Sequence, residues 1–76
     1  MKSFNIMLDS INKVKAFVNI VAKCDYDVDL TSGRYVVDAK SIMGIFSLDL
    51  SKPIKIDIHS DNCGDFEAEI KEFIVE

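Results

Sequence analysis

Cysteine, histidine and long hydrophobic runs are scarce in this sequence. The 76 residues contain two cysteines, Cys24 and Cys63, and a single histidine, His59. The cysteines form no C-x-x-C pair, and there is neither a signal peptide nor an apolar run of about 20 residues that could span a membrane. We therefore expect a cytoplasmic protein with free thiols and no membrane association.

Basic charge is also in short supply. Nine lysine and arginine residues stand against thirteen aspartate and glutamate residues, which gives a net charge of -4. Because an acidic chain without a basic stripe is repelled by the phosphate backbone, we expect no nucleic-acid partner. Nearly half of the residues, 49%, are hydrophobic. This composition predicts a folded chain, and its length predicts one domain over residues 1–76.

Two patterns offer weak metal sites. If the chain is extended, Asp57, His59 and Asp61 alternate onto one side, but a set without cysteine or glutamate is more typical of a solvated strand end. A calcium loop that begins at Asp25 requires glycine at its sixth position and glutamate at its twelfth. This chain has Leu30 and a valine there instead. We expect no metal ion and no cofactor.

Alternating apolar and polar side chains predict four strands, at residues 3–8, 25–30, 34–38 and 54–59. The tripeptide at residues 31–33, Thr-Ser-Gly, supplies the turn that makes the middle two strands a β-hairpin. The three aspartates within residues 25–29 then lie on the solvent face of the second strand. Arg34 or Lys55 on neighbouring strands would relieve their mutual repulsion.

Helical spacing of apolar residues predicts helices near residues 10–23, 41–47 and 65–75. The first helix turns these residues toward the core: Ile11, Val14, Phe17, Val18 and Val21. The last helix does the same with Phe66, Ile70, Phe73 and Ile74. The order β-α-β-β-α-β-α, with every strand apolar on one side only, predicts an α+β fold. In this fold an antiparallel sheet carries all three helices on one face.

A helix start and several large apolar side chains occur together after residue 40. Ser41 precedes the apolar run, where its oxygen can accept a hydrogen bond from a first-turn amide as an N-cap. Gly44 within so short a helix costs about 1 kcal/mol relative to alanine, which indicates that the backbone there approaches something closely. Ile42, Met43 and Phe46 have no obvious core to enter. Each of them either fills the core or forms a contact patch for a partner.

Residues 40–48, with the sequence KSIMGIFSL, resemble the regulatory-serine segment of HPr, the histidine-containing phosphocarrier family of the bacterial sugar phosphotransferase system. The similarity extends to residues 22–25, 28–30, 36–38 and 54–58, so the resemblance covers effectively the whole chain. It implies an HPr-like open-faced β-sandwich with sheet order 1-4-2-3. It also implies a phosphocarrier-family protein that is not an enzyme.

The resemblance stops at the loop after the first strand, where the HPr family carries its phosphorylated histidine in a Gly-x-His-x-Arg-Pro setting. Residues 8–12 of this chain read LDSIN, with Ser10 nearest to the place of the histidine and Asn12 nearest to that of the arginine. A phosphohistidine needs an imidazole, helix amides and a cation. We therefore expect Ser10 to be a helix cap. His59 lies at the end of the last strand, which the family does not use for transfer.

The resemblance thus implies a degenerate, Crh-like HPr relative that lacks the phosphorylatable histidine and keeps the serine. We expect a regulatory protein-binding module in sugar transport and catabolite repression, switched by phosphorylation at Ser41 and contacting partners through Ile42, Met43 and Phe46. The expected partners are HPr kinase or a transcriptional regulator. Two alternatives stay open: an accessory structural domain in which Ser41 is only a cap, and a phosphate carrier that uses another residue.

Overall fold

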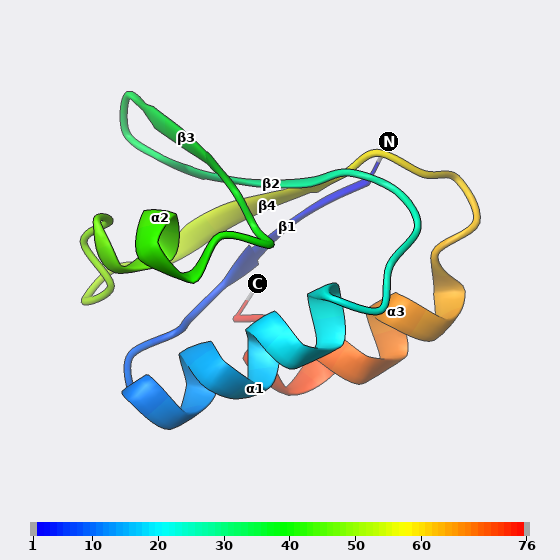
Figure 1. Cartoon of the computed structure of the whole chain (residues 1–76), viewed down its shortest axis with the longest axis horizontal. Coiled ribbons are helices and arrows are strands. Elements are labelled where there is room, and N and C mark those ends of the chain that lie inside the picture. The colour runs from blue at the N-terminus through cyan, green and yellow to red at the C-terminus, as the bar shows by residue number, and fades with distance from the viewer. Residues whose placement is uncertain (1, 76) are drawn as a thin grey trace.

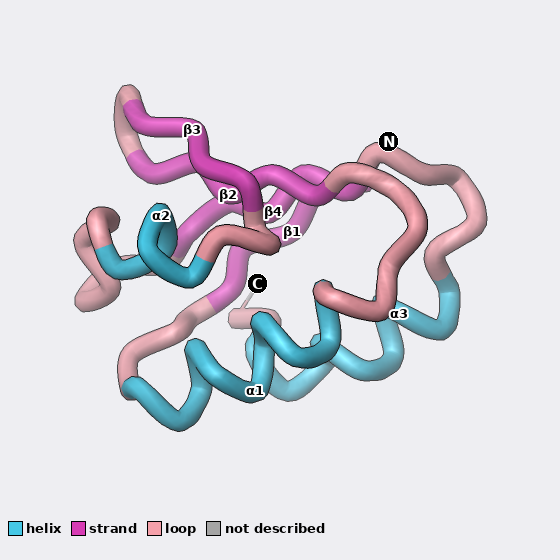
Figure 2. The backbone as a smooth tube through the Cα atoms, viewed as in Figure 1, coloured by secondary structure: helices cyan, strands magenta, loops and turns pink. Residues whose placement is uncertain are grey.

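The computed structural model describes residues 2–75 as a four-stranded sheet with helices packed against one of its faces (Figure 1). The strands are β1 (Lys2–Ile6), β2 (Val28–Ser32), β3 (Tyr35–Asp38) and β4 (Ile54–Ile58). The helices are α1 (Ile11–Val21), α2 (Ile42–Phe46) and α3 (Gly64–Ile70), followed by a short 3-10 turn, η1 (Lys71–Phe73). Figure 2 separates these elements from the loops that connect them.

The strands follow the order β1-β4-β2-β3, and every neighbouring pair is antiparallel, which confirms the predicted sheet. Strand β4 fixes which face is covered, because its three isoleucines are fully buried while Lys55 and Asp57 alternate onto the other face. On the covered face, Ile56 lies opposite Phe4 of β1 and Leu30 of β2. The α+β architecture is therefore the one expected from the sequence.

The hydrophobic core fills the space between this face and the helices. Helix α1 contributes Val14, Phe17 and Val21, all fully buried. The rings of Phe17 and Phe73 meet edge to face with their centroids 6.0 Å apart, which joins α1 to the turn after α3. None of the helices within residues 2–75 combines the length and the apolar character needed to cross a bilayer.

The first strand is shorter than predicted. Residues 3–8 were expected to be extended against the sheet, but β1 ends at Ile6. The amide of Met7 donates to the carbonyl oxygen of Phe73 at 2.8 Å. From Met7 on, the chain therefore no longer pairs with β4 and bonds to the C-terminal segment instead. Leu8 is nevertheless fully buried, as the alternation predicts.

The last helix is also shorter than predicted. Helix α3 ends at Ile70, and after η1 the chain is extended, with Ile74 bridged antiparallel to Ile6. The amide of Val75 donates to the carbonyl oxygen of Asn5 at 3.0 Å. The residues after η1 bond to the free edge of β1 instead of extending the helix, because the backbone groups of an edge strand need hydrogen-bond partners.

The predicted second strand begins at Val28 rather than at residue 25. Of the three aspartates expected on its solvent face, only Asp29 belongs to the strand, where it lies opposite Asp57 of β4. Lys55 does approach Asp57, with 3.7 Å between Nζ and Oδ1. Arg34 forms no ion pair with the rest of residues 2–75. Within residues 2–75, neither Arg34 nor Lys55 forms an ion pair with any of the three aspartates of residues 25–29. The expectation that one of these two cations relieves their repulsion is therefore wrong.

Candidate functional site

Ser41 caps α2. Its Oγ accepts a hydrogen bond from the amide of Gly44 at 3.2 Å, and its extended backbone is typical of an N-cap. The Ser41 amide in turn donates to the carbonyl oxygen of Asp38 at 2.9 Å, and the Asp38 carboxylate accepts from the Lys40 amide at 2.8 Å. The last residue of β3 thus fixes the start of α2, while the Ser41 hydroxyl group stays on the surface.

Gly44 lets α2 approach β3 closely. A Cβ atom at this position would lie 3.2 Å from Cβ of Val37 and 3.3 Å from Oγ of Ser41. Both distances are shorter than ordinary van der Waals contact, so a larger residue would require the neighbours to move. The close approach expected at this glycine is thus to the edge strand of the sheet.

The large apolar residues of α2 divide between the core and the surface. Ile45 is fully buried, and Leu48, just after the helix, is also in the core. In contrast, Met43 is 77% exposed, Phe46 43% and Ile42 37%. The sequence left open whether these three side chains fill the core. The structure places them on the surface, where the predicted contact patch requires them to be.

A hollow of about 580 Å³ connects α2 with the start of α1. Its apolar lining consists of Ile11, Phe46 and Leu50. On its polar side it is lined by Asp9, Ser10 and Ser51. The structure therefore brings Ser10, in the loop after β1, and Phe46 of the predicted patch to one surface. We call Ile11, Ile42, Met43, Phe46 and Leu50 together the α1–α2 apolar surface.

Ile11 was expected in the core and is 61% exposed, so that prediction is wrong. Its spacing from Val14 continues the buried stripe of α1, which is why periodicity alone assigned it to the core. It is the first residue of α1, and burial along this helix begins only one turn later, at Val14. Ile11 and Leu50 are the members of this surface that sequence reasoning missed. The one local sign of Ile11's exposure was its position directly after the N-cap Ser10, at the very start of the helix.

Ser10 is the N-cap of α1, as predicted. Its Oγ accepts a hydrogen bond from the Lys13 amide at 3.2 Å. The Lys13 ammonium group lies 2.9 Å from Oδ1 of Asp9. Through that hydrogen bond and its charge it lowers the pKa of the Asp9 carboxyl group. Asn12 is exposed in the first turn of the helix.

The only histidine lies at the other end of the sheet. Ile6, which precedes the loop between β1 and α1, faces Ile54 at the start of β4, whereas His59 follows the end of β4. Because a five-residue strand separates the two ends, His59 does not reach the N-terminus of α1. The prediction that it cannot replace the missing loop histidine agrees with this register.

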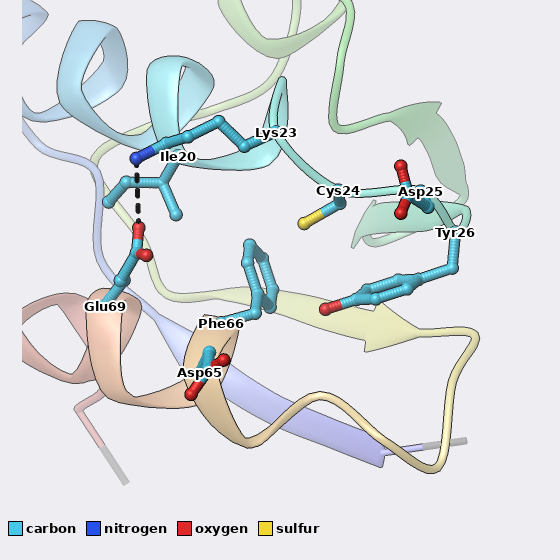
Figure 3. A pocket seen from close by; sticks show the side chains of 8 residues that line it. All are labelled: Ile20, Lys23, Cys24, Asp25, Tyr26, Asp65, Phe66 and Glu69. Atoms are coloured by element: carbon cyan, nitrogen blue, oxygen red, sulfur yellow. Dashed lines mark ion pairs between the residues drawn. The ribbon is translucent and has the colours of Figure 1, made fainter.

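A second hollow, of about 160 Å³, lies where α1 ends (Figure 3). The Lys23 ammonium group lies 3.5 Å from a Glu69 carboxylate oxygen at its rim, and the rings of Tyr26 and Phe66 meet edge to face inside it. Burial, then a hydrogen bond with Cys24, raise the pKa of Tyr26 to about 12. These residues are packed against one another and form no constellation for transfer chemistry.

The two cysteines are free thiols, as predicted. Cys63 is buried, and its Sγ lies 3.7 Å from a Glu67 carboxylate oxygen. Burial, together with the charge of Glu67, raises the pKa of the Cys63 thiol. A thiol held in its neutral form is a poor nucleophile.

Comparisons with known proteins agree with this geometry. The model of the family described as "PTS HPr component phosphorylation site" matches residues 12–75. A crystal structure of HPr-C-His from Thermoanaerobacter tengcongensis superposes with a TM-score of 0.79 and 25% identity, covering 97% of this chain and 91% of that one. The phosphocarrier protein HPr from Bacillus anthracis str. Ames gives a TM-score of 0.71 and 24% identity, covering 95% of this chain and 93% of that one. A search of curated proteins gives no match.

The matched segment spans most of the chain, so the chain belongs to the HPr family of the sugar phosphotransferase system. Proteins of this family are phosphocarriers rather than enzymes, and they act through contacts with other proteins of that system. The match begins at Asn12, the last residue of the segment 8–12 in which the family motif is missing from this sequence.

Proposed function

We propose that this chain is a regulatory protein-binding module of the HPr family, switched by phosphorylation at Ser41, and that it does not carry phosphate on a histidine. One observation carries the proposal. Three large apolar side chains, Ile42, Met43 and Phe46, are exposed on the helix that Ser41 caps. Since a small protein rarely exposes such a cluster without using it, the surface is suited to binding a partner.

The absence of an imidazole at the start of α1 supports the loss of histidine phosphotransfer. Ser10 stands at the helix N-terminus and uses its Oγ as a cap. A serine phosphate is too stable to pass its phosphoryl group on as a phosphohistidine does. Incubation with phosphoenolpyruvate and Enzyme I should leave the protein unphosphorylated, whereas an acid-labile phosphate on any residue would contradict this part of the proposal.

A phosphate on Ser41 would act on the adjacent apolar residues. It would add about two negative charges beside Ile42 and Met43, the first two residues of α2, both of which are exposed. The fold should tolerate these charges because they stand at the positive end of a helix. Stability should therefore stay nearly constant while the choice of partner changes. A transcriptional regulator of sugar use is the expected partner of the phosphorylated form, and HPr kinase is the expected modifying enzyme.

The decisive experiment is a reaction with HPr kinase, ATP and magnesium, with a histidine-containing HPr as the positive control. We expect phosphate incorporation into the wild-type chain and into the Ser47→Ala variant, but none into Ser41→Ala. Ser47 lies at the other end of the same short helix, which makes it a matched control. If only the positive control is modified, Ser41 is merely a cap in an accessory structural domain.

Binding to the same kinase tests the contact residues. Met43→Asp should weaken binding at least tenfold, because it introduces a carboxylate at the most exposed side chain of the α1–α2 apolar surface. Asn19→Asp provides a control on the exposed side of α1, outside that surface, and should bind like the wild type. Equal binding by both variants would show that Met43 does not contact this partner.

A further inference from the structure

The two edges of the sheet differ in how their backbone groups are satisfied. The free side of β1 is partly covered by the C-terminal segment, through the bridge of Ile6 with Ile74 and the bond between Val75 and Asn5. Strand β3 forms the other edge, and within residues 2–75 no further strand pairs with it. An uncovered edge presents unpaired amides and carbonyls that can bind another strand.

The register of β2 and β3 identifies which backbone groups are free. The amide of Ala39 donates to the carbonyl oxygen of Val28 at 2.9 Å. Hydrogen-bonded and non-bonded pairs alternate along an antiparallel ladder, so Leu30 and Val37 form the next bonded pair. Val36, one residue removed, therefore points its N–H and C=O groups away from β2 and out of the sheet.

The side chains of β3 add apolar area to this free edge. Tyr35 is 70% exposed and Val36 is 63% exposed, and neither belongs to the α1–α2 apolar surface. Strand β3 contains no proline, lysine or bulge, three of the features with which edge strands discourage pairing, and its one charged residue, Asp38, stands at its end. Val36 also interrupts an otherwise polar outer face, since its neighbours there are Thr31 and the aspartates.

We propose that β3 pairs with β3 of a second copy of this chain, antiparallel and with Val36 opposite Val36 across a twofold axis. The charges on the outer face select this register. With Val36 at the axis, Arg34 of each copy faces Asp38 of the other. Arg34 has no ion pair within residues 2–75, and Asp38 lies opposite the like-charged Asp29. Both residues thus gain an opposite charge.

The same register is favourable on the inner face. Tyr35 of one copy lies opposite Val37 of the other, so two exposed tyrosine rings each cover a half-buried valine. The backbone groups of the two Val36 residues exchange a pair of hydrogen bonds at the axis. The two sheets become one continuous sheet. Because each strand has four residues, the association is small and belongs to the weak, concentration-dependent class.

Hydrogen exchange provides the first test, in the full chain at protein concentrations from about 10 μM to about 1 mM, the range in which weak association is detected. We expect the Val36 amide to become at least tenfold more protected as concentration rises. The Val37 amide, which is bonded to β2, should be equally protected throughout and is the internal control. A Val36 amide that exchanges at one rate at all concentrations would overturn the proposal.

Sedimentation of variants provides the second test. Val36→Lys should be monomeric at every concentration, whereas Asn5→Lys, on the opposite edge of the sheet, should dimerise like the wild type. Arg34→Asp alone and Asp38→Lys alone should each lose the dimer, because each variant places like charges opposite each other across the axis. Their mixture should form a heterodimer, because one native Arg34–Asp38 pair is then kept and the other pair is restored with its charges reversed. If Asp38→Lys disturbs the start of α2, circular dichroism will reveal it, and Arg34→Asp then decides the register. Dimers that persist in Val36→Lys and Arg34→Asp would disprove pairing through β3.

Discussion

The Nε2 atom of His59 donates to a carboxylate oxygen of Asp29 at 2.8 Å, which ties the end of β4 to β2. Asp29 also lies directly opposite Asp57 on one side and Asp38 on the other. The only histidine of the sequence therefore contacts the middle one of three neighbouring aspartates on the uncovered face of the sheet. Across residues 2–75, no group of three or more histidine, cysteine, aspartate or glutamate side chains is placed to hold a metal ion.

Replacing Asp29 with asparagine should stabilise the protein. The substitution removes repulsion with two facing carboxylates and keeps an oxygen acceptor for His59, so we expect the free energy of unfolding to rise by about 0.5 kcal/mol. Urea denaturation measures this change. Asp27→Asn is the control, since that residue lies outside the strand, and added salt should shrink the difference by screening the charges. A loss of stability in Asp29→Asn would show that the contact with His59 outweighs the repulsion.

Gly44→Ala should destabilise the protein, although alanine favours helix formation. The propensity gain is about 1 kcal/mol, but a Cβ atom 3.2 Å from Cβ of Val37 forces the neighbour to move. We expect a net loss of about 1 kcal/mol from overpacking. In a Val37→Gly background, which lacks the Cβ atom that the new methyl group would meet, the same change should become neutral or stabilising. If Gly44→Ala costs the same in both backgrounds, the contact with β3 is not the reason for the glycine.

Met43→Asp should leave the fold intact, whereas Ile45→Asp should not. Met43 is 77% exposed and Ile45 is fully buried, although they lie in the same short helix. We expect the melting temperature to fall by less than about 5 °C in Met43→Asp and by more than about 15 °C in Ile45→Asp, because an unpaired buried carboxylate is costly. Thermal melts of the two variants distinguish surface from core, and similar melting temperatures would contradict the division of α2 described above.

Alkaline pH should weaken the fold through Tyr26. Its pKa in the folded protein, about 12, is above the ordinary value of about 10, so the folded state disfavours the phenolate. The corresponding stability is complete below pH 10 and is lost as pH rises from about 10 toward 12. The ultraviolet absorbance of phenolate in a Tyr35→Phe variant reports Tyr26 alone. Tyr26→Phe should remove this part of the alkaline loss, and an ordinary titration near pH 10 in the folded protein would disprove the shift.

Most of the fold could be predicted because each element has one apolar side. The alternation of Ile54, Ile56 and Ile58 with polar residues predicted β4 and its covered face. This pattern can be recognised without knowing which strands lie beside β4. Both ends of the chain were less predictable. Ile74 has the spacing of a helical core residue, yet it is extended because the free edge of β1 offers it a partner. Competition of this kind depends on distant residues and leaves no local pattern.

The candidate site was predictable in part for a similar reason. Serine before an apolar run is a local signal, so the caps at Ser10 and Ser41 could be read directly. For Ile42, Met43 and Phe46, the sequence left two possibilities open, burial in the core or exposure as a contact patch. Ile11 was assigned to the core because periodicity predicts which face of a helix is apolar. It does not predict at which residue along the helix that face stops being buried.

The pairing of β1 with β4 and with Ile74 has a consequence for synthesis on the ribosome. The first strand leaves the exit tunnel early, but both of its partners belong to the second half of the chain. Only the hairpin of β2 and β3 can close between neighbouring segments as they emerge. Until β4 follows, the hydrophobic side of β1 has no sheet to join and is available to chaperones. The slow step of folding is therefore expected to be the insertion of β4 between β1 and β2, because it pairs the first strand of the sheet with the last strand in the sequence.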